Sequence, residues 1–367
     1  MIYEYNRGDS SPWKPYFDII PQTFDTLMFW TDDELAELQA SAVREKIGRN
    51  EADDSFVVHV IPTILKHPQL FFPGASTPPA QEVLEAAHRM GSIIMAYAFD
   101  IEAENDKREV DEEGYASEDE DSALPKGMVP LADILNADAD RNNARLFYEK
   151  DALTMKALKP IKKGEEIFND YGPLPRADLL RRYGYITPNY AQYDVVEISQ
   201  DLVVQLVRAS SGQLNDKALD ERLSYLDDQA VLDSGYDITR PSSHDDPTDA
   251  ISPELIILIA TLLLPIDEFR RLVSKEKLPK PKMTAQIAWL LRSALQKRAA
   301  QYVTSIEEDR ALLAADHVAG RKAMAVEVRL GEKEILEAAG ALLERFVGEG
   351  HRANGVEGPT SKKRRIT

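Results

Sequence analysis

The sequence predicts an α+β fold in which a small group of antiparallel strands lies between two helical regions. Residues 1–100 and the chain after Tyr190 carry apolar side chains at helical spacing, whereas residues 145–169 alternate apolar and polar side chains between turns. At about 150 residues per domain, a chain of 367 residues is expected to form two domains. We expect residues 1–187, which contain the strands, to form the first domain and residues 188–349 to form an all-α second domain.

The N-terminal region is expected to contain two main helices. The first begins after Thr31, because a threonine N-cap precedes an acidic turn and an apolar stripe at Leu35 and Leu38. Residues 77–79, Thr-Pro-Pro, then interrupt the chain. The following stretch, QEVLEAAHRMGSIIMAYAF, predicts a second and longer helix that ends near Phe99.

A strongly acidic stretch separates this helix from the strands. Residues 102–121 hold eleven acidic residues against Lys107 and Arg108, a net charge of −9, and few apolar residues. Such a composition cannot bury enough apolar surface to offset the entropy of ordering, so we expect residues 102–122 to be a disordered loop. The loop either steers a basic substrate toward a nearby site or is a solvated segment without such a role.

The strands are expected to form a small antiparallel β-meander. Arg145–Tyr148 and Ala152–Leu158 are joined by a turn at residues 149–151. After the turn KPIKKG, Glu165–Asn169 is expected to be the third strand. From Tyr190 onward the pattern is helical.

The second domain is expected to contain a fully buried helix. Ser252 is an N-cap residue and Pro253 suits the first helical position. The apolar run Leu255–Leu264 has ten residues, whereas a membrane span needs roughly 20, so this run predicts a buried helix. Residues 350–367 form a predicted disordered basic tail ending in SKKRR, which is either a nuclear import signal or a cluster without function.

Composition removes several functional classes. The absence of cysteine rules out disulfides, thiolate zinc sites and a cysteine nucleophile. The six histidines show no metal-ligand spacing, and the chain contains no Gly-x-Gly-x-x-Gly motif, P-loop or Gly-x-Ser-x-Gly elbow. The net charge of −19 argues against non-specific nucleic-acid binding and is compatible with a basic partner or with a merely soluble acidic protein.

One polar and aromatic group of residues remains as a candidate site. It consists of Asn136 after the apolar run PLADIL, the segment Asn169–Gly172, and the segment Arg182–Tyr185. The last two segments each contain a tyrosine followed by a glycine, and glycine permits a close approach of the backbone. A single tyrosine in such a place is usually a core residue, but the combination of the three segments favours a functional site.

These segments carry a resemblance to a known family. MVPLADILNADAD, GEEIFNDYG and LLRRYGYI, in this order, resemble the C-terminal half of a SET-domain protein lysine methyltransferase. The chain is similar to the branch that contains the Rubisco large-subunit methyltransferase, and within it to the fungal ribosomal lysine methyltransferases of the fourth type. SPWKPYF and the residues after it look like the helical insert of the SET domain. YVTSIEEDRALL and KAMAVEVRLGEKEIL look like the end of the helical substrate-binding domain.

The resemblance implies a narrow channel in which a lysine meets S-adenosylmethionine. Tyr171 is expected to line this channel as the catalytic residue and to contact the substrate. The expected cofactor-binding residues are Tyr97, Asn136, Ala137 and Tyr183, and Trp13 is expected on the substrate side. Ala137 stands where the family carries a histidine, so one side-chain hydrogen bond to the cofactor is lost here.

The implied chemistry requires no metal. Lysine has a reference pKa of about 10.4, so its ammonium must lose a proton before nitrogen attacks the methyl group. A dry channel favours the neutral amine by desolvation. The Tyr171 hydroxyl then orients the nitrogen, and positioning and electrostatics account for the rate.

Two functions remain open at this point. The resemblance implies opening strands with a Gly-x-Gly element for the cofactor, and we expect this chain to lack them because it starts at MIYEYNRGDSSPW. The first hypothesis is a protein-lysine N-methyltransferase, and the second is a catalytically impaired homologue that acts as a protein-binding module. The expected partner is a basic protein, expected to be ribosomal, with no nucleic acid and no membrane. The expected location is the nucleus, and also the cytoplasm.

Overall fold

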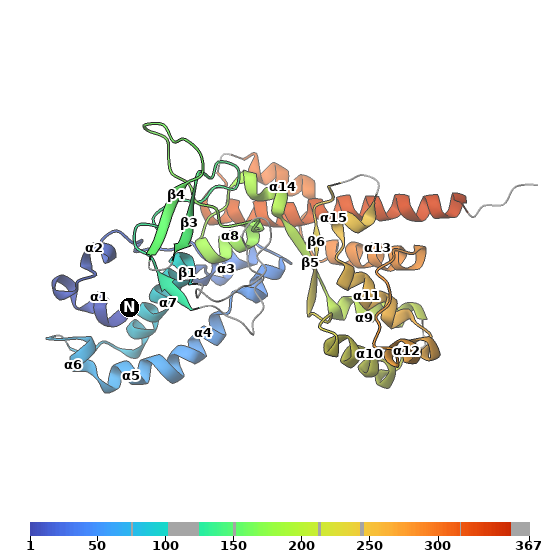
Figure 1. Ribbon diagram of the computed structural model, residues 1–367, viewed down its shortest axis with the longest axis horizontal. Coiled ribbons are helices and arrows are strands. Elements are labelled where there is room, and N and C mark those ends of the chain that lie inside the picture. Colours follow the sequence, from blue (N-terminus) through green and yellow to red (C-terminus); the bar gives the residue numbers. More distant parts are fainter. Residues whose placement is uncertain are drawn as a thin grey trace, which may run out of the picture. The chain divides into compact units, whose positions relative to one another are not determined.

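In the computed structural model the chain forms two compact units, which are described separately. The structure describes residues 1–74, 76–101, 125–149, 152–211, 214–242, 246–315 and 317–353 (Figure 1). Unit 1 comprises Met1–Leu38, Ala42–Tyr193 and Asp316–Val328, and unit 2 comprises Gln39–Ser41, Asp194–Ala315 and Arg329–Thr367. Unit 1 therefore continues six residues past the predicted boundary at residue 187 and includes residues 316–328 of the predicted second domain.

Unit 1 is built mainly from short helices, as the sequence predicts for its N-terminal part. The longest of them, α7, spans Ala80–Tyr97 and ends two residues before the predicted end. The helical segments in chain order are α1 (Ile2–Asn6), η1 (Gly8–Ser10), α2 (Lys14–Phe17), η2 (Leu27–Phe29), α3 (Asp32–Ala36), η3 (Ala42–Lys46), α4 (Arg49–Ser55), η4 (Phe56–Val60), α5 (Ile61–Lys66), α6 (Pro68–Phe71), α7, α8 (Arg176–Tyr183) and η6 (Pro188–Tyr193).

Thr31 caps α3 as predicted. Its side chain accepts a hydrogen bond from the Glu34 N–H at 3.3 Å, and the Glu34 carboxylate accepts one from the Thr31 N–H at 2.8 Å. This reciprocal capping box satisfies two N–H groups that a helix start leaves without partners. The helix itself is short, but it places Leu38 in the core, where the side chain is fully buried.

The described part of unit 1 contains two antiparallel strand pairs. β1 (Ala98–Asp100) follows α7 directly and pairs with β2 (Lys126–Met128). β3 (Ala144–Glu149) pairs with β4 (Ala152–Ala157), with Arg145 opposite Lys156. The β3–β4 hairpin confirms the first two predicted strands.

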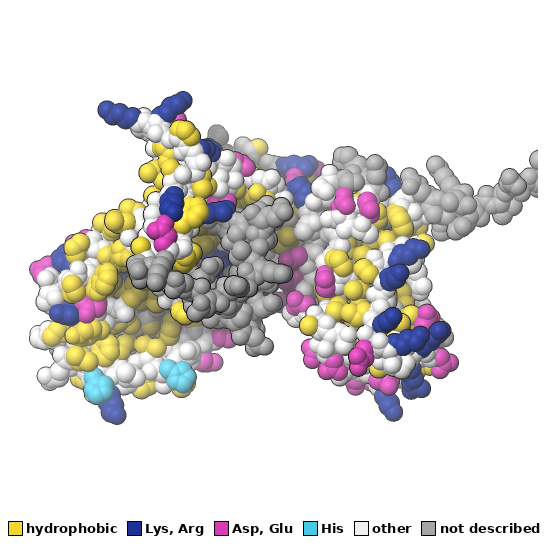
Figure 2. Space-filling view, viewed as in Figure 1, with side chains coloured by type: hydrophobic (Ala, Val, Ile, Leu, Met, Phe, Trp, Pro, Cys, Tyr) yellow, Lys and Arg dark blue, Asp and Glu magenta, His cyan; other side chains and the backbone are white. Residues whose placement is uncertain are grey.

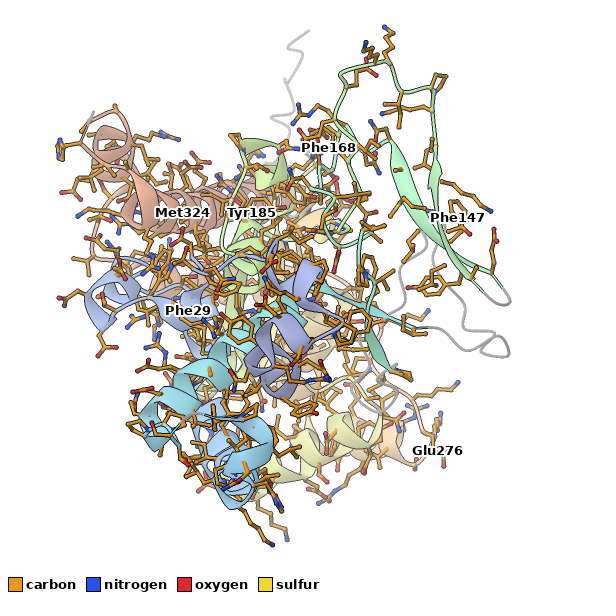
Figure 3. The ribbon with its side chains drawn as sticks, turned by 90° about the vertical axis from the view of Figure 1, so that its left-hand side faces the viewer. Phe29, Phe147, Phe168, Tyr185, Glu276 and Met324 are labelled. Atoms are coloured by element: carbon orange, nitrogen blue, oxygen red, sulfur yellow. The ribbon has the colours of Figure 1, made fainter. Side chains whose placement is uncertain are left out.

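The predicted third strand at Glu165–Asn169 is wrong. The backbone of this segment is instead hydrogen-bonded to the Asn143 side chain. The Asn143 amide donates to the Glu166 carbonyl at 2.8 Å, and its Oδ1 accepts a hydrogen bond from the Phe168 N–H at 2.9 Å. The N–H groups of Asn143 and Ala144 both donate to the Phe168 carbonyl at 3.1 Å. Phe168 is labelled in Figure 3. The Asn143 side chain and two backbone N–H groups therefore provide hydrogen bonds that a regularly paired neighbouring strand would provide.

Unit 2 is helical, as predicted, but it is not all-α. β5 (Val195–Ser199) and β6 (Gly235–Thr239) form an antiparallel pair, and α9, α11 and α13 pack together beside it (Figure 1). The helical segments are α9 (Gln200–Ser211), α10 (Asp216–Asp228), η7 (Pro247–Ala250), α11 (Pro253–Leu263), α12 (Ile266–Val273), α13 (Ala285–Ala299), α14 (Ile306–Leu313) and α15 (Gly320–Ala353), whose first residues belong to unit 1.

Helix α11 confirms the predicted buried helix. Ser252 accepts a hydrogen bond from the Leu255 N–H at 3.3 Å, and Pro253 occupies the first turn. Residues Leu255–Ile259 are at most 9% exposed, so the apolar run lies in the core of unit 2. Within the described ranges, no helix is both long and apolar enough to cross a membrane.

Two predicted disordered segments lie largely or wholly outside the described residues. The acidic loop at 102–122 lies outside them entirely. The predicted tail at 350–367 begins inside α15, because that helix runs to Ala353, and residues 354–367 lie outside.

The two units bury apolar side chains to different extents. Among the described residues, unit 2 has one large apolar core around α9, α11, α13 and α15, whereas unit 1 has three separate small clusters. Figure 2 shows hydrophobic side chains on the visible face of unit 1. Exposed apolar residues of unit 1 include Ile19, Val57, Val58, Leu70, Leu131 and Ile134. In unit 2 the exposed large apolar residues that the structure describes are Ile266, Val273, Trp289 and Val303, so apolar burial among the described residues is less complete in unit 1.

Candidate functional site

A cavity of about 280 Å³ in unit 1 brings most of the predicted site residues together. It lies where the segment after α2, the end of α7, the loop after β2 and the residues around α8 converge. The lining residues are Tyr16, Ile19, Ile20, Pro21, Ala96, Tyr97, Asp133, Ile134, Leu135, Asn136, Ala137, Tyr171, Tyr183 and Tyr185. Five of the six residues expected from the resemblance, all except Trp13, are among them.

A short parallel pairing joins two of the three candidate segments. Ala137 pairs with Asn169, since the Asn169 N–H donates to the Asn136 carbonyl at 2.8 Å and the Asp138 N–H donates to the Asn169 carbonyl at 3.0 Å. Ala137 and Asn169 are both buried. This pairing places Tyr171, two residues after Asn169, at the cavity wall beside the loop after β2.

The two Tyr-Gly pairs serve to stack their tyrosines. The rings of Tyr171 and Tyr183 lie 4.4 Å apart at an angle of 16°. Gly172 has a φ of +82° and Gly184 a φ of +78°, conformations that glycine adopts readily. Gly184 ends α8, and a Cβ there would lie 2.7 Å from the Thr26 nitrogen. Glycine is therefore required at position 184 by both conformation and close packing.

Burial favours the neutral form of several tyrosines of the cavity. Burial raises the pKa of Tyr171, and the neighbouring Tyr183, Tyr185, Tyr97 and Asp133 raise it further. Burial also raises the pKa of Tyr185 and of Tyr97. At neutral pH these hydroxyls consequently remain protonated and can both donate and accept hydrogen bonds.

Asp133 is a buried carboxylate at the cavity wall. Its Oδ2 accepts a hydrogen bond from the Tyr16 hydroxyl at 2.6 Å. Its Oδ1 is buried and has no hydrogen-bond partner among the described residues. Burial raises the pKa of Asp133, although the hydrogen bond from Tyr16 opposes this effect. Burial and the hydrogen bond to Asp133 raise the pKa of Tyr16 as well.

Of the other predicted residues, Asn136 and Ala137 line the cavity and Trp13 does not. The Asn136 amide donates to Glu166 Oε1 at 2.6 Å, which fixes the orientation of this exposed side chain. Ala137 offers only a buried methyl group. Trp13 does not line the cavity and is 51% exposed. The roles expected for these residues stay predictions, whereas their positions are now known.

Three polar residues among the described lining of the cavity had no role predicted from the sequence. Tyr16 and Tyr185 lie inside segments that were singled out, SPWKPYF and RYGYI, but were given no role there. Asp133 is a carboxylate within the apolar run PLADIL, and a charge in such a run is the signal that could have identified it. Tyr16 and Asp133 are 117 positions apart, so no local pattern could reveal their hydrogen bond.

Two family models match the chain. The SET domain model matches residues 15–172, and the Rubisco LSMT substrate-binding model matches residues 213–336. The first range contains Tyr97, Asp133, Asn136 and Tyr171 of the cavity. The second range lies entirely in the part of the chain that was predicted to form the helical domain.

Curated relatives agree with both models. "Ribosomal lysine N-methyltransferase 4" of Saccharomyces cerevisiae is 33% identical over 272 residues, which cover 72% of this chain and 54% of that protein. "N-lysine methyltransferase SETD6" of Homo sapiens is 28% identical over 356 residues, which cover 90% of this chain and 70% of that protein. The chain therefore spans about half the length of the yeast relative.

Solved structures share the fold. Rubisco LSMT bound to AdoMet has a TM-score of 0.64 and 22% identity, with 98% of this chain and 78% of that chain covered. The SET domain of LSMT bound to lysine and AdoHcy also has a TM-score of 0.64, with 23% identity, and covers 95% of this chain and 74% of that chain. At this identity the likeness establishes the fold, a SET domain with a helical substrate-binding region.

Proposed function

Because the chain belongs to the family of SET-domain protein lysine methyltransferases, we propose that it transfers methyl groups from S-adenosylmethionine to lysine side chains of a protein. The observation that supports this proposal is the cavity of unit 1, which combines five tyrosines with one buried carboxylate. Aromatic faces and a carboxylate attract cations. Both reactants of this transfer, a sulfonium and an ammonium, are cations.

The residues of the cavity suit the proposed cofactor. Tyr97, Asn136, Ala137 and Tyr183 would hold it, and the buried Asp133 oxygen without a partner fits a positively charged group. The cofactor would supply a methyl group carried on a sulfonium. The tyrosine rings and aliphatic side chains that line the cavity would desolvate a bound lysine, and desolvation favours the neutral amine over the ammonium.

Tyr171 is the proposed catalytic residue. Its ring is held by the stack on Tyr183, and its raised pKa keeps the hydroxyl protonated, so the hydroxyl can orient the lysine nitrogen. Tyr171 would thereby also contact the substrate. Trp13 is the second proposed substrate contact, and its exposed ring is accessible to a protein that approaches unit 1.

The substrate is a protein, and we propose that it is a basic, ribosomal one. The name of the yeast relative refers to ribosomal lysines, and the net charge of −19 favours a basic partner. The same charge disfavours nucleic acid as a partner. A membrane partner is not proposed either.

We propose the nucleus as the main location, with a further population in the cytoplasm. The basic cluster SKKRR at residues 361–365 supports this proposal. A fluorescent fusion that stays out of the nucleus, with or without this cluster, would disprove it.

The proposed function is tested by methyl transfer to ribosomal proteins. We predict that the chain, given labelled S-adenosylmethionine, methylates a ribosomal protein, and that Tyr171→Phe lowers kcat at least about tenfold, or about 1.4 kcal/mol of barrier. Binding of S-adenosylmethionine, measured by calorimetry, should change little. Tyr225→Phe is the matched control, since it removes a hydroxyl in unit 2 that bonds the Lys277 carbonyl.

Two outcomes would contradict this assignment. Equal losses of cofactor affinity and of kcat in Tyr171→Phe would show that Tyr171 is structural. A chain that binds ribosomal protein but transfers no methyl group would instead be a protein-binding module, the second hypothesis raised by the sequence.

A further inference from the structure

Asp133 stands out among the residues that line the cavity. It is the one charged residue among the lining residues that the structure describes, and it is 5% exposed. Oδ2 accepts a hydrogen bond from the Tyr16 hydroxyl at 2.6 Å, whereas Oδ1 has no hydrogen-bond partner in the described part of the chain. Among the described residues that line the cavity, none has a basic side chain.

A buried carboxylate in this state is incompletely compensated. Burial of a charge is costly unless the charge is paired, and the groups that stabilise the Asp133 carboxylate, the Tyr16 hydroxyl and the backbone N–H groups of Leu131 and Asp133, are neutral and leave it without a countercharge. The field of Asp133 reaches across the cavity, because its charge contributes to the raised pKa of both Tyr97 and Tyr171. A cation in the cavity would therefore interact favourably with Asp133 as well as with the tyrosine rings.

Tyr16 fixes the position of this carboxylate. The Tyr16 side chain is 8% exposed and packs with Phe17, Met90 and Ile93 in one of the clusters of unit 1. Its ring is thus held by α2 and α7, and its hydroxyl meets Asp133 at a short distance. Without this hydroxyl both carboxylate oxygens would lack a side-chain partner in the described part of the chain, and only the backbone N–H groups of Leu131 and Asp133 would still favour the charged carboxylate.

We propose that Tyr16 is a positioning residue that holds the Asp133 carboxylate at the cavity, and that this pair makes the cavity favour positively charged ligands over neutral ligands of similar shape. The proposal rests on the proposed function only for the identity of the cation. That cation is either the sulfonium of the cofactor or the ammonium of the substrate lysine. Both groups carry one positive charge, but the first belongs to the cofactor and the second to the protein substrate.

Small probe ions test the proposal directly on the full chain. Trimethylsulfonium and butylammonium are titrated against the protein and followed by NMR, with dimethyl sulfide and butanol as neutral counterparts. We expect the wild-type chain to bind at least one cation more tightly than its neutral counterpart. Tyr16→Phe should weaken that binding roughly tenfold, the effect expected for loss of a hydrogen bond to a charged group, and leave the neutral probes unchanged.

Two further variants make the result interpretable. Asp133→Asn keeps the shape of the side chain and removes its charge, so it should abolish the preference for cations even if Tyr16→Phe perturbs packing. Tyr5→Phe is the matched control, because it removes a hydroxyl from the same cluster that bonds Gln22 rather than Asp133. Its cation preference should equal that of the wild type.

The outcomes separate this proposal from the proposed function. A loss confined to trimethylsulfonium, or to butylammonium, supports the proposal and assigns the pair to the cofactor or to the lysine. A wild-type chain without cation preference, or a preference unchanged in Tyr16→Phe and Asp133→Asn, overturns it. Cation preference in a chain that methylates nothing would refute only the proposed function, whereas methylation without cation preference would refute only this proposal.

Discussion

Gly184 shows how one residue constrains the candidate site. Its φ of +78° costs a non-glycine residue about 1–2 kcal/mol, and a Cβ would meet the Thr26 nitrogen at 2.7 Å and the Asp25 carbonyl carbon at 2.8 Å. Both are backbone atoms that cannot rotate away. We predict that Gly184→Ala lowers the free energy of unfolding of unit 1 by about 2–4 kcal/mol, since overpacking adds to the conformational cost.

A second glycine provides the matched control for this prediction. Gly74 has the same φ of +78°, but nothing lies within 4 Å of a Cβ there, so Gly74→Ala should show the conformational cost alone. Denaturant unfolding of both variants measures the difference. Equal losses would mean that the close approach to Thr26 carries no energy.

At the residue scale, five of the fourteen described residues that line the cavity were expected from the sequence, but its charged residue was not. Tyr171 and Tyr183 were predictable because each precedes a glycine in a recognisable segment. Asn136 was expected at the site because its segment resembles a motif of the family. Asp133 and Tyr16 were not, because their importance comes from a tertiary hydrogen bond and from burial, neither of which has a local sequence pattern. Trp13 was expected at the site from the resemblance, and its exposed position leaves that role a prediction.

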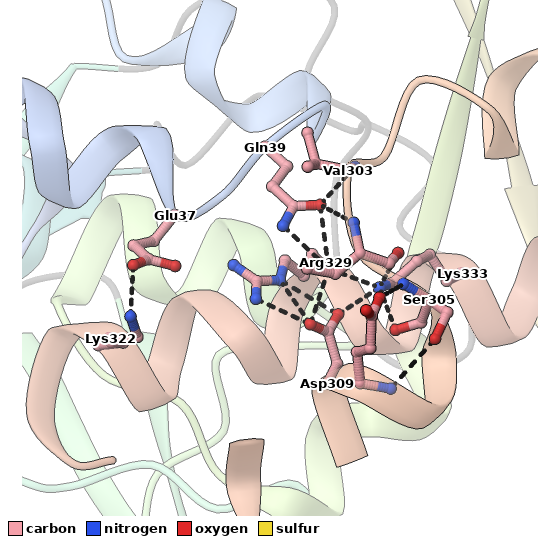
Figure 4. Close-up of polar contacts among 10 residues, drawn as sticks. Glu37, Gln39, Val303, Ser305, Asp309, Lys322, Arg329 and Lys333 are labelled. Carbon is pink, nitrogen blue, oxygen red and sulfur yellow. Dashed lines mark hydrogen bonds and ion pairs between the residues drawn. The ribbon is translucent and has the colours of Figure 1, made fainter. Parts of the chain in front are cut away.

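At the element scale, a buried ionic cluster joins α14 to α15 in unit 2. Asp309, fully buried, accepts hydrogen bonds from Arg329 at 2.8 Å, from Lys333 and from Thr304 at 2.8 Å (Figure 4). Burial alone would raise the pKa of Asp309, but these bonds outweigh it and hold the pKa below its usual range. One carboxylate of α14 therefore binds two cationic side chains of α15.

Removal of that carboxylate should destabilise unit 2 strongly. We predict that Asp309→Ala lowers the free energy of unfolding by about 3–5 kcal/mol, because Arg329 and Lys333 remain buried without their shared anion. The control is Glu344→Gln, which breaks an ion pair with Arg292 in which Glu344 is 64% exposed. That loss should stay below about 1 kcal/mol in the same urea titration. Similar losses in the two variants would argue against a stabilising role of the cluster.

Helices were easier to predict than strands. Caps such as Thr31 and Ser252 act within one turn, so local sequence contains them. The strand predicted at Glu165–Asn169 failed because the Asn143 side chain takes its hydrogen bonds. β5 and β6 were missed although Val196, Ile198, Tyr236 and Ile238 alternate toward the core, because two helices separate the strands and each has five residues.

At the scale of the whole molecule, the two units have separate cores and should respond separately to solution conditions. Glu332 is the residue of unit 2 that makes this testable. Its carboxylate is buried and accepts hydrogen bonds from the Ser41 hydroxyl at 2.6 Å and the Tyr302 hydroxyl at 2.5 Å. Burial raises the pKa of Glu332 to about 7; Ser41, Tyr302 and Arg298 oppose this rise, and Asp194 adds to it.

The raised pKa fixes the sign of the pH dependence. Between the ordinary glutamate pKa of 4.5 and about 7, the folded state keeps the Glu332 proton while the unfolded state has lost it. The stability contributed by this group is therefore fully present below pH 4.5 and is lost as pH rises toward 7, by up to about 3 kcal/mol. The low pKa of Asp309 acts in the opposite direction, but only below the usual aspartate range, and so outside this window.

We predict that unit 2 unfolds at a lower denaturant concentration at pH 8 than at pH 5.5, and that Glu332→Gln flattens this dependence. Glutamine keeps the size and one acceptor of the carboxylate but cannot titrate. Fluorescence of Trp289 reports unit 2, and Trp30, buried in unit 1, reports the other core. Glu334→Gln, on the same helix but bonded to Arg240 and Arg310, is the control and should keep the wild-type slope. Parallel pH profiles of the wild type and Glu332→Gln would show that Glu332 ionises in the folded state as freely as in the unfolded one.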